Sequence, residues 1–355
     1  MQLRSQENCN EIYHNPLFVN KQVDIGGINV FYADDGFYYL YGSGEYSKQV
    51  LYRSKNLVDW ENTHIVPIPE KVQREIQNME QPSKLVPGKE KFKSTTRFWA
   101  PMIAKVGSNY NLYTSVGAYS GIICLQSQSP LGPFTFQHYD RKGKPKKLID
   151  LKDVGIPYDV IDACYVYDHT DGRNYLFFGS NFGVYRVELS KDGTELATSH
   201  YFELIAGCQS GGGVSGGYEG TMVYFYQGYW YLILSPRGNY KLLCWRCRDL
   251  KGPFLDEKGN SPMSDKYGHE ILKPQEDSFK TPEGYSLRRT GHSGEIFMDK
   301  SGRYFIFCEA SVEPLKNPWW RKAPCLTEIK WDKEGWPSAI TKDRRVAYEN
   351  VRPNM

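Results

Sequence analysis

The chain has 355 residues, of which 40% are hydrophobic and 24% are charged, and its formal net charge is +3 at pH 7. The length allows one large or two ordinary domains, and the composition is typical of a soluble globular protein. The small net charge, with no concentrated basic face, excludes a nucleic-acid partner. The lack of an apolar run of about 18 residues excludes a membrane-spanning helix.

The N-terminal stretch "MQLRSQENCNEIYHNP" has no apolar centre, so it does not read as a signal peptide. We expect residues 1–14 to form an N-terminal extension, and the compartment stays open between cytoplasmic and secreted or periplasmic with a signal removed. The eight cysteines are predicted to be free thiols. The closest pair, Cys244 and Cys247, lies in a strand-like segment whose positions three apart face opposite sides, which disfavours a shared metal.

Five segments along the chain share a turn with Gly or Asn followed by an aromatic-rich strand, a hairpin signal. Their matching apolar residues, 56 to 74 residues apart, are Leu40, Leu112, Leu176, Leu232 and Ile306. Each interval holds about four short strands, the size of a propeller blade with insertions. Only Pro69–Gln81 favours a helix. The sequence therefore predicts an all-β fold, a single five-bladed β-propeller domain over residues 15–350.

Polar and aromatic residues precede four of these hairpins by thirteen or fourteen residues, and they are Trp99, Asp162, Glu219 and His292. Equivalent positions on the innermost strands of a propeller converge at one end of its axis, so these residues are predicted to form a ring. Two carboxylates across an aromatic-walled pocket suit glycoside hydrolysis, one as general acid and one as general base. The alternative interpretation, of equal weight from the repeat alone, is that Asp162 and Glu219 are solvated or ion-paired strand ends.

An ordered set of motifs runs from Asn15 to roughly Tyr348. It comprises "NPL", "SKNLVDWE", "FWAP", "SQSPLGPF", "VIDACYVYDHTDGRNYLFFGS", "GYEGTMVYFYQGYWYLILS", "KGPF" and "GHSGEIFMDKSGRY". Each motif is weak by itself, and "FWAP" is the strongest marker. In this order the set resembles glycoside hydrolase family 43, a family of five-bladed propellers. The resemblance implies an inverting hydrolase (EC 3.2.1.-) of α-L-arabinofuranosyl or β-D-xylosyl linkages in plant-type glycans, a carbohydrate partner and no cofactor for the chemistry.

The resemblance also implies roles for individual residues. Glu219 matches the general acid, and Asp162 matches the carboxylate that orients it and raises its pKa by like-charge repulsion. His292 matches an axial histidine that would ligate calcium or sodium, largely through waters, although a satisfied core histidine is the alternative. Trp99 would stack on a sugar or simply pack, and Arg288 or Arg289 would reach substrate or remain solvated.

Two alignments compete for the residue that acts as general base. The resemblance places it near Asp24, three residues before Gly27, where the hairpin count lands, and a bulge at the adjacent glycines would bring Asp24 to the axis. Glu295 could serve instead, or the base is lost. Asp34 and Asp35 are expected to be turn residues. Two alternative functions follow: a carbohydrate-binding propeller with weak or no hydrolysis, and a related hydrolase with galactosyl-type specificity. Oligomeric state stays open.

Overall fold

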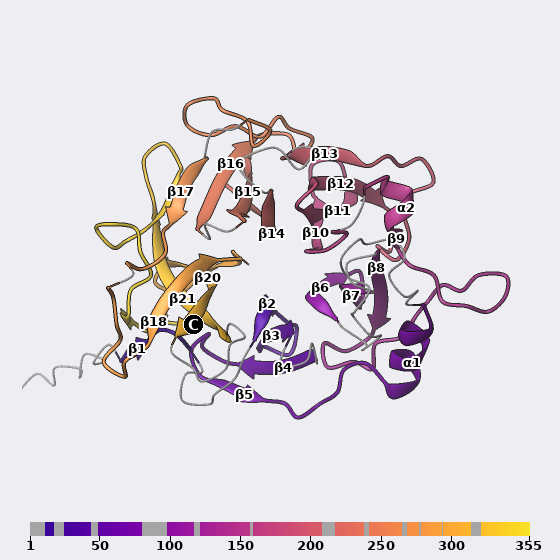
Figure 1. The fold of residues 1–355 in the computed structure, drawn as a ribbon, viewed down its shortest axis with the longest axis horizontal. Coiled ribbons are helices and arrows are strands. Elements are labelled where there is room, and N and C mark those ends of the chain that lie inside the picture. Colours follow the sequence, from indigo (N-terminus) through magenta and orange to yellow (C-terminus); the bar gives the residue numbers. More distant parts are fainter. Residues whose placement is uncertain are drawn as a thin grey trace, which may run out of the picture.

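The structure is a computed structural model of the chain. It describes residues 11–17, 25–43, 49–79, 98–116, 121–156, 159–207, 217–237, 241–264, 268–276, 278–292, 294–313 and 321–355. Its strands form five antiparallel sheets arranged around a central axis, as Figure 1 shows. The predicted five-bladed β-propeller is confirmed.

The blades follow one another along the chain, and each sheet is built from consecutive antiparallel strands. Blade 1 contains β2 (Gly26–Tyr32), β3 (Tyr38–Ser43), β4 (Gln49–Ser54) and β5 (Trp60–Asn62). Blade 2 contains β6 (Trp99–Val106), β7 (Asn109–Val116), β8 (Gly121–Ser127) and β9 (Ile149–Asp150). Blade 3 contains β10 (Cys164–Asp168), β11 (Arg173–Ser180), β12 (Gly183–Leu189) and β13 (Glu203–Ala206).

The last two blades complete the ring. Blade 4 contains β14 (Tyr218–Tyr226), β15 (Tyr229–Pro236), β16 (Leu242–Cys247) and β17 (His269–Leu272). Blade 5 contains β18 (Ser286–Gly291), β19 (Ile296–Met298), β20 (Tyr304–Glu313), β21 (Arg321–Trp331) and β22 (Pro337–Ala339). A separate pair, β1 (Ile12–His14) with β23 (Glu349–Val351), joins the two ends of the described chain.

The hairpins that marked the repeat connect the first two long strands of their blades. Leu40, Leu112, Leu176 and Leu232 pair with residues of the innermost strand, and all four are fully buried. Apolar side chains fill the spaces between neighbouring sheets, one cluster joining blades 1 and 2 and another joining blades 2 and 3. The apolar alternation that predicted strands therefore places the core between the blades.

The predicted helix at Pro69–Gln81 is present as α1 (Glu70–Met79), and residues 80 and 81 lie outside the described part of the chain. Its buried residues, Val72 and Ile76, are four apart and enter the core between blades 1 and 2. A second, single-turn helix is α2 (Leu151–Val154). No helix within the described ranges is long and apolar enough to cross a membrane.

Six of the eight cysteines lie in described segments, and all six are buried free thiols, as predicted. Cys9 and Cys208 lie outside the described residues. Cys244 and Cys247 both belong to β16, where they pair with different residues of β15. They behave as small apolar core residues rather than as a metal site.

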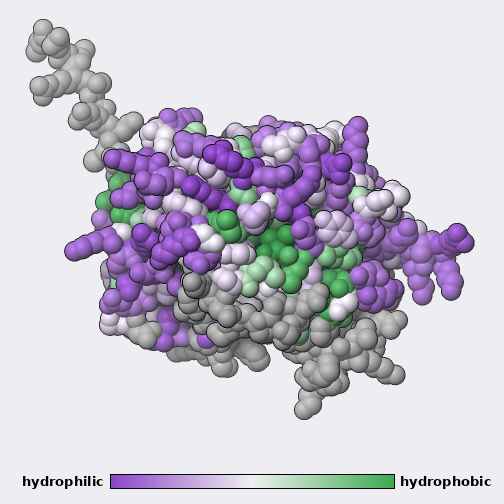
Figure 2. Space-filling view, turned by 90° about the horizontal axis from the view of Figure 1, so that it is seen from above, coloured by the Kyte–Doolittle hydropathy of each residue, from purple (hydrophilic) through white to green (hydrophobic). Residues whose placement is uncertain are grey.

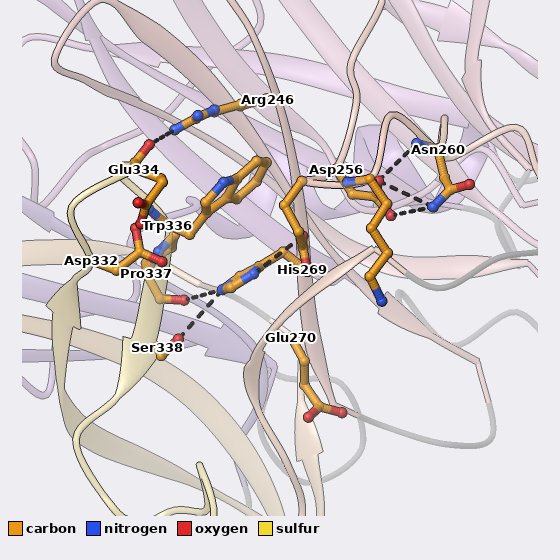
Figure 3. A network of polar contacts seen from close by, with 12 residues as sticks. Arg246, Asp256, Asn260, His269, Glu270, Asp332, Glu334, Trp336, Pro337 and Ser338 are labelled. Carbon is orange, nitrogen blue, oxygen red and sulfur yellow. Dashed lines mark hydrogen bonds and ion pairs between the residues drawn. The ribbon is translucent and has the colours of Figure 1, made fainter.

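The outer edges of blades 4 and 5 are joined by a stack of aromatic and cationic groups, shown in Figure 3. The rings of His269 and Trp336 stack with their centroids 5.1 Å apart, and His269 donates from Nε2 to the carbonyl of Pro337 at 2.9 Å. The guanidinium of Arg246 lies 4.2 Å from the Trp336 ring centroid and donates to the carbonyl of Glu334. These contacts hold the two blades together far from the axis.

Most of the described surface is polar. Seen from the upper edge of the view in Figure 1, hydrophilic residues cover much of the molecule, and hydrophobic residues gather in a patch near the centre of the view (Figure 2). The aromatic residues are mainly interior. Twelve of the largest side chains are almost completely inaccessible, and eleven of these are Tyr or Phe. Aromatic content here therefore reflects strand packing first.

Candidate active site

A pocket lies on the propeller axis, and all five blades contribute to its wall. Its lining residues are Gly27, Ile28, Asn29, Ala100, Pro101, Met102, Asp162, Ala163, Gly220, Thr221, Met222, His292 and Glu295. The pocket thus contains two of the predicted ring residues, Asp162 and His292, and Glu295, which was named as an alternative base. The innermost strands bring these residues together from positions up to 268 residues apart in the chain, the interval between Gly27 and Glu295.

The innermost strands share an irregular pairing at the end that faces the propeller axis. The pairing of β2 with β3, β6 with β7, and β14 with β15 shifts by one residue at the same place in each blade. Just before the shift, three residues pair with equivalent serines: Gly26 with Ser43, Trp99 with Ser115, and Glu219 with Ser235. A bulge bends the strand and redirects its side chains, which suits a site at the rim of a sheet.

Blades 3 and 5 continue this pattern. The carbonyl of Ile161 accepts a hydrogen bond from the amide of Gly179 at 2.7 Å, and Gly291 pairs with Glu309. We call the five residues at this position the first ring layer: Gly26, Trp99, Ile161, Glu219 and Gly291. The residues that follow them form the second ring layer: Gly27, Ala100, Asp162, Gly220 and His292.

Every member of the second ring layer has a left-handed backbone, with φ between 43° and 64°. Non-glycine residues rarely adopt this conformation, and its recurrence in all five blades identifies it as part of the bulge. At Gly27 an added Cβ would also lie 2.9 Å from the Cα of Ala100. All five second-layer residues line the pocket.

This register corrects one prediction. Trp99 and Glu219 share the first ring layer, but Asp162 and His292 belong to the second, one residue further along the strand. The count from the hairpins also aligned Gly27 with Trp99 and Glu219, whereas the residue at that position is Gly26. The error arises because Val30 and its partner Leu40 are ten residues apart, one more than the equivalent partners in blades 2 and 4.

Glu219 lies near the start of β14, with 17% of its side chain exposed. Its Oε1 lies 3.2 Å from Nε of Arg237, which follows directly after β15 and whose side chain is 47% exposed. The amide of Arg237 also donates to the carbonyl of Gly217 at 3.0 Å, so the backbone holds this arginine beside the strand that carries the acid. The sequence analysis missed Arg237, because its position after a different strand gave no signal.

Asp162 is buried, and its Oδ2 accepts a hydrogen bond from the amide of Gly220 at 2.8 Å. Gly220 directly follows Glu219, so a side chain of blade 3 holds the backbone that carries the acid of blade 4. A carboxylate that binds a backbone amide of the next blade fixes the local geometry, which is what a positioning residue does. The structure therefore brings Asp162 and Glu219 together as predicted neighbours in the ring.

His292 lies between two carboxylates. Its Nε2 is 3.4 Å from Oδ2 of Asp162, and its Nδ1 is 3.5 Å from Oε1 of Glu309. Its backbone amide donates to the Ser235 hydroxyl at 2.6 Å, which ties blade 5 to blade 4. Burial by itself would lower the pKa of His292, but the carboxylates of Glu309 and Asp162 outweigh it and raise the pKa to about 10.

Both ring nitrogens of His292 face carboxylates, and the calcium or sodium ion expected near it stays a prediction. Among the described residues, no group of three or more His, Cys, Asp or Glu side chains could hold a metal ion. Asp162 and Glu309 satisfy the charge of His292, so it is an ion-paired cation on the axis. Within the described part of the chain its buried Nδ1 has no hydrogen-bond partner, so the interpretation as a satisfied core histidine does not account for all of its contacts.

Glu309, which the sequence analysis did not single out, connects blades 5 and 1. It lies on β20, and its Oε1 accepts from the amide of Ile28 at 2.9 Å while its Oε2 lies 2.9 Å from Nζ of Lys322. Burial would raise the pKa of Glu309, but Lys322 and His292 lower it well below its usual range. The signal for it was available in the repeat: Glu309 occupies the strand position where blades 1, 2 and 4 carry Ser43, Ser115 and Ser235.

Glu295 also bridges blades 5 and 1, deeper on the axis. Its Oε1 accepts from the side chain of Asn29 at 2.9 Å and from the amide of Val30 at 3.0 Å. Burial raises the pKa of Glu295, although these hydrogen bonds oppose the shift. Asn29 in turn accepts from the amide of Ile103 in blade 2. Glu295 is thus bound by several donors, an arrangement that suits a structural link more than a base activating water.

Three further predicted site residues, Trp99, Arg288 and Arg289, lie outside the pocket wall that the described residues form. Trp99 is half-buried in the first ring layer, and its carbonyl accepts from the Thr114 hydroxyl at 3.1 Å. Arg288 lies on β18 with its Nε 3.4 Å from Oε2 of Glu313, and Arg289 is exposed with a left-handed φ of 52°. In the part of the chain that the structure describes, neither arginine belongs to the pocket wall.

Asp24 lies outside the described residues, so its position relative to the pocket stays a prediction. The structure does describe the residue after next. Gly26 takes the blade 1 place in the first ring layer, and a Cβ added there would lie 2.7 Å from Cδ of Lys322 and 3.6 Å from Oε2 of Glu309. The side chain that blade 1 lacks is therefore replaced by the Lys322–Glu309 ion pair. Asp34 and Asp35 are turn residues, as expected.

Comparison with known proteins places this pocket in context. The model of the family "Glycosyl hydrolases family 43" matches residues 13–337. The chain is 27% identical over 198 residues to the extracellular endo-alpha-(1->5)-L-arabinanase 1 of Bacillus subtilis, a region covering 53% of this chain and 57% of that protein. The chain spans about half the length of the curated relatives it matches.

Solved structures share the fold. The Cellvibrio cellulosa alpha-L-arabinanase complexed with arabinohexaose superposes with a TM-score of 0.66 at 21% identity, covering 90% of this chain and 96% of that chain. The endo-1,5-alpha-L-arabinanase of Thermotoga petrophila superposes with a TM-score of 0.67 at 18% identity, covering 89% and 74%. With a family model that spans most of its length, and with the pocket and propeller described above, this chain belongs to glycosyl hydrolases family 43.

Proposed function

We propose that the chain is a glycoside hydrolase that cleaves α-L-arabinofuranosyl linkages of arabinan-type glycans, or β-D-xylosyl linkages, with inversion at the anomeric carbon. The observation that carries the proposal is the hydrogen bond between Asp162 and the amide of Gly220, which joins two carboxylate-bearing blades at the axial pocket. The family membership and the arabinanases among the relatives support the substrate class.

In the proposed mechanism Glu219 is the general acid. Its carboxyl group donates a proton to the glycosidic oxygen as the bond to the anomeric carbon breaks. Asp162 positions Glu219 through the amide of Gly220. Trp99, in the same ring layer as Glu219, offers an apolar face for a sugar ring. Arg288 and Arg289 are proposed to act beyond the pocket wall, on more distant sugars.

Asp24 is the proposed general base. It would take a proton from the water that attacks the anomeric carbon from the face opposite Glu219, which inverts the configuration. The reaction needs no cofactor. A calcium or sodium ion, held largely through waters, would lie near His292 on the axis, and no step uses such an ion.

The test is hydrolysis of a panel of aryl glycosides and of linear and branched arabino- and xylo-oligosaccharides, with product configuration followed by NMR from the first turnover. We expect activity on at least one member, an inverted product, and a loss of roughly 10²–10⁴-fold in Glu219→Gln. Glu313→Gln, which changes an acid next to Arg288, is the matched control. A retained anomeric configuration, or unchanged activity in Glu219→Gln, would contradict the mechanism.

One observation favours a second candidate, a propeller that binds sugar but hydrolyses it weakly or not at all. Gly26 takes the place in blade 1 where blade 4 carries Glu219, and the Lys322–Glu309 pair fills the space. If Asp24 does not reach the axis, the site lacks a base. Saturable binding of oligosaccharides by the native protein, with no product after prolonged incubation, would favour this candidate.

A further inference from the structure

Two cations contact members of the first ring layer. Arg237 contacts Glu219 in blade 4, and Lys322 covers Gly26 in blade 1. Their side chains are 47% and 34% exposed, so both reach solvent. The family resemblance predicted neither residue as part of the site. Their positions call for a physical explanation, since neutral sugars do not require charged partners.

Arg237 loses its partner when the acid becomes competent. Glu219 must carry a proton before it can donate one, and a neutral carboxyl group no longer balances the guanidinium charge. The backbone bond from Arg237 to Gly217 keeps the residue beside the acid. A carboxylate on the substrate would replace Glu219 as the partner, and a planar guanidinium is well suited to bind one with two parallel hydrogen bonds.

Lys322 can also exchange its partner without leaving a buried charge unpaired. When the ammonium group turns toward a ligand, Glu309 keeps the hydrogen bond from the amide of Ile28 and the contact with His292 at Oε1, while its Oε2 gives up the contact with Lys322. The stem of Lys322 occupies the space that a side chain at Gly26 would fill. The backbone of Lys322 also accepts from the amide of Ile25, which fixes the start of β21 beside blade 1.

We propose that Arg237 and Lys322 are specificity-determining residues that select glycans bearing a uronate carboxylate close to the cleaved linkage. The inference deepens the proposed function and rests on it for the location of the substrate. It assigns the acidic group to the first ring layer, between the blade that carries Glu219 and the blade that carries Gly26.

The test compares two oligosaccharides that differ in one group: an arabino- or xylo-oligosaccharide with a single uronate substituent, and the same compound with that carboxylate methyl-esterified. We expect the native protein to bind the acid roughly tenfold more tightly than the ester, as one charge-assisted contact allows. The preference should shrink as salt is raised, because both cations are partly exposed. Calorimetry gives the two dissociation constants, and KM values give the same ratio where turnover occurs.

Substitutions at the two cations test whether they cause the preference for the acid over the ester. Lys322→Met and Arg237→Met should each reduce the ratio of the two dissociation constants toward one, and Lys322→Arg should retain it. Lys105→Met is the matched control, since Lys105 is a half-exposed lysine that pairs with Asp34 at the opposite end of a blade 2 strand. The control should leave the ratio unchanged, and thermal melting of every variant checks that the propeller still folds.

The outcomes separate this inference from the proposed function. A ratio near one in the native protein, or a ratio that survives both methionine variants, overturns the inference even if neutral glycans are hydrolysed. A preference for the acid that both variants remove, in a protein that hydrolyses none of the panel, upholds the inference and rejects the hydrolase. Hydrolysis together with the preference supports both.

Discussion

Blades 4 and 1 present the same backbone to the axis with different side chains. Both innermost strands bulge after a residue that pairs with a serine, Glu219 with Ser235 and Gly26 with Ser43, and both continue in a left-handed glycine. Blade 4 thus offers a carboxylate, and blade 1 offers an empty position that Lys322 fills. The fold repeats the geometry of the ring, while individual residues decide which chemistry each blade contributes.

A similar contrast separates blades 3 and 5 from the rest. Their second-layer residues, Asp162 and His292, carry polar side chains where blades 1, 2 and 4 have Gly27, Ala100 and Gly220. Those side chains cross to neighbouring blades, so the ring is held by contacts between blades as well as by the sheets. The predictions below probe the two contrasts, starting with the largest effect.

The largest expected effect concerns the missing acid of blade 1. If Asp24 supplies the base that Gly26 cannot, Asp24→Asn should lower kcat by roughly two orders of magnitude or more with little change in KM. Added azide should restore part of the rate, because a small anion can replace the lost base. Steady-state kinetics with and without azide make the measurement. An unaffected rate would show that blade 1 contributes no base from this residue.

The next effect concerns the link between blades 3 and 4. Asp162→Ala removes the carboxylate oxygen that accepts from the amide of Gly220, so Glu219 loses both its orientation and a neighbouring negative charge. We expect kcat to fall roughly 10²-fold, since small displacements of a catalytic group have effects of this size. The pH–rate profile should shift as well. A drop in rate caused only by poorer folding would leave the profile unmoved.

The ion-paired His292 should make stability depend on pH. Its pKa in the folded protein, about 10, lies above the ordinary value of 6.5. The stabilisation from its charge is therefore complete below about pH 6.5, and it is lost as pH rises toward 10. The groups facing the ring are Asp162 and Glu309, with Lys322 behind Glu309.

Thermal melts of the native protein and of His292→Gln across this range measure the effect. We expect the melting temperature of the native protein to fall more steeply with pH than that of the variant, by a few degrees overall, roughly as expected for one group. Parallel curves of melting temperature against pH would show that a group other than His292 causes the pH dependence. If the ring holds no divalent ion, added EDTA should leave both curves unchanged.

The smallest effect contrasts the two glycines at the start of blade 1. Gly27→Ala forces a left-handed φ of 58° on a residue whose Cβ would meet the backbone of Ala100, which should cost about 1–3 kcal/mol. Gly26→Ala meets only the flexible stem of Lys322, so we expect a cost under about 1 kcal/mol. Urea unfolding measures both. Equal costs would refute the backbone argument.

The sequence by itself determined the all-β class, the five hairpins and the residues Glu219, Asp162, Trp99 and His292. These features depend on local patterns, namely turn residues, alternation and motif order, which a linear sequence displays directly. The helix α1 and the free thiols followed from the same kind of local signal. Asp24 is the exception, since its role rests on an alignment that the described residues do not reach.

Only the tertiary structure decided how the ring is assembled. Hairpins of different length moved Asp162 and His292 into a second layer and put Gly26 rather than Gly27 in the same layer as Glu219. Paired residues are ten apart at Val30 and Leu40, eleven at Tyr165 and Leu176, and nine at Val223 and Leu232. Arg237, Glu309 and Lys322 lie outside the quoted motifs. Their contacts join residues far apart in the chain, and such contacts arise only when the blades close around the axis.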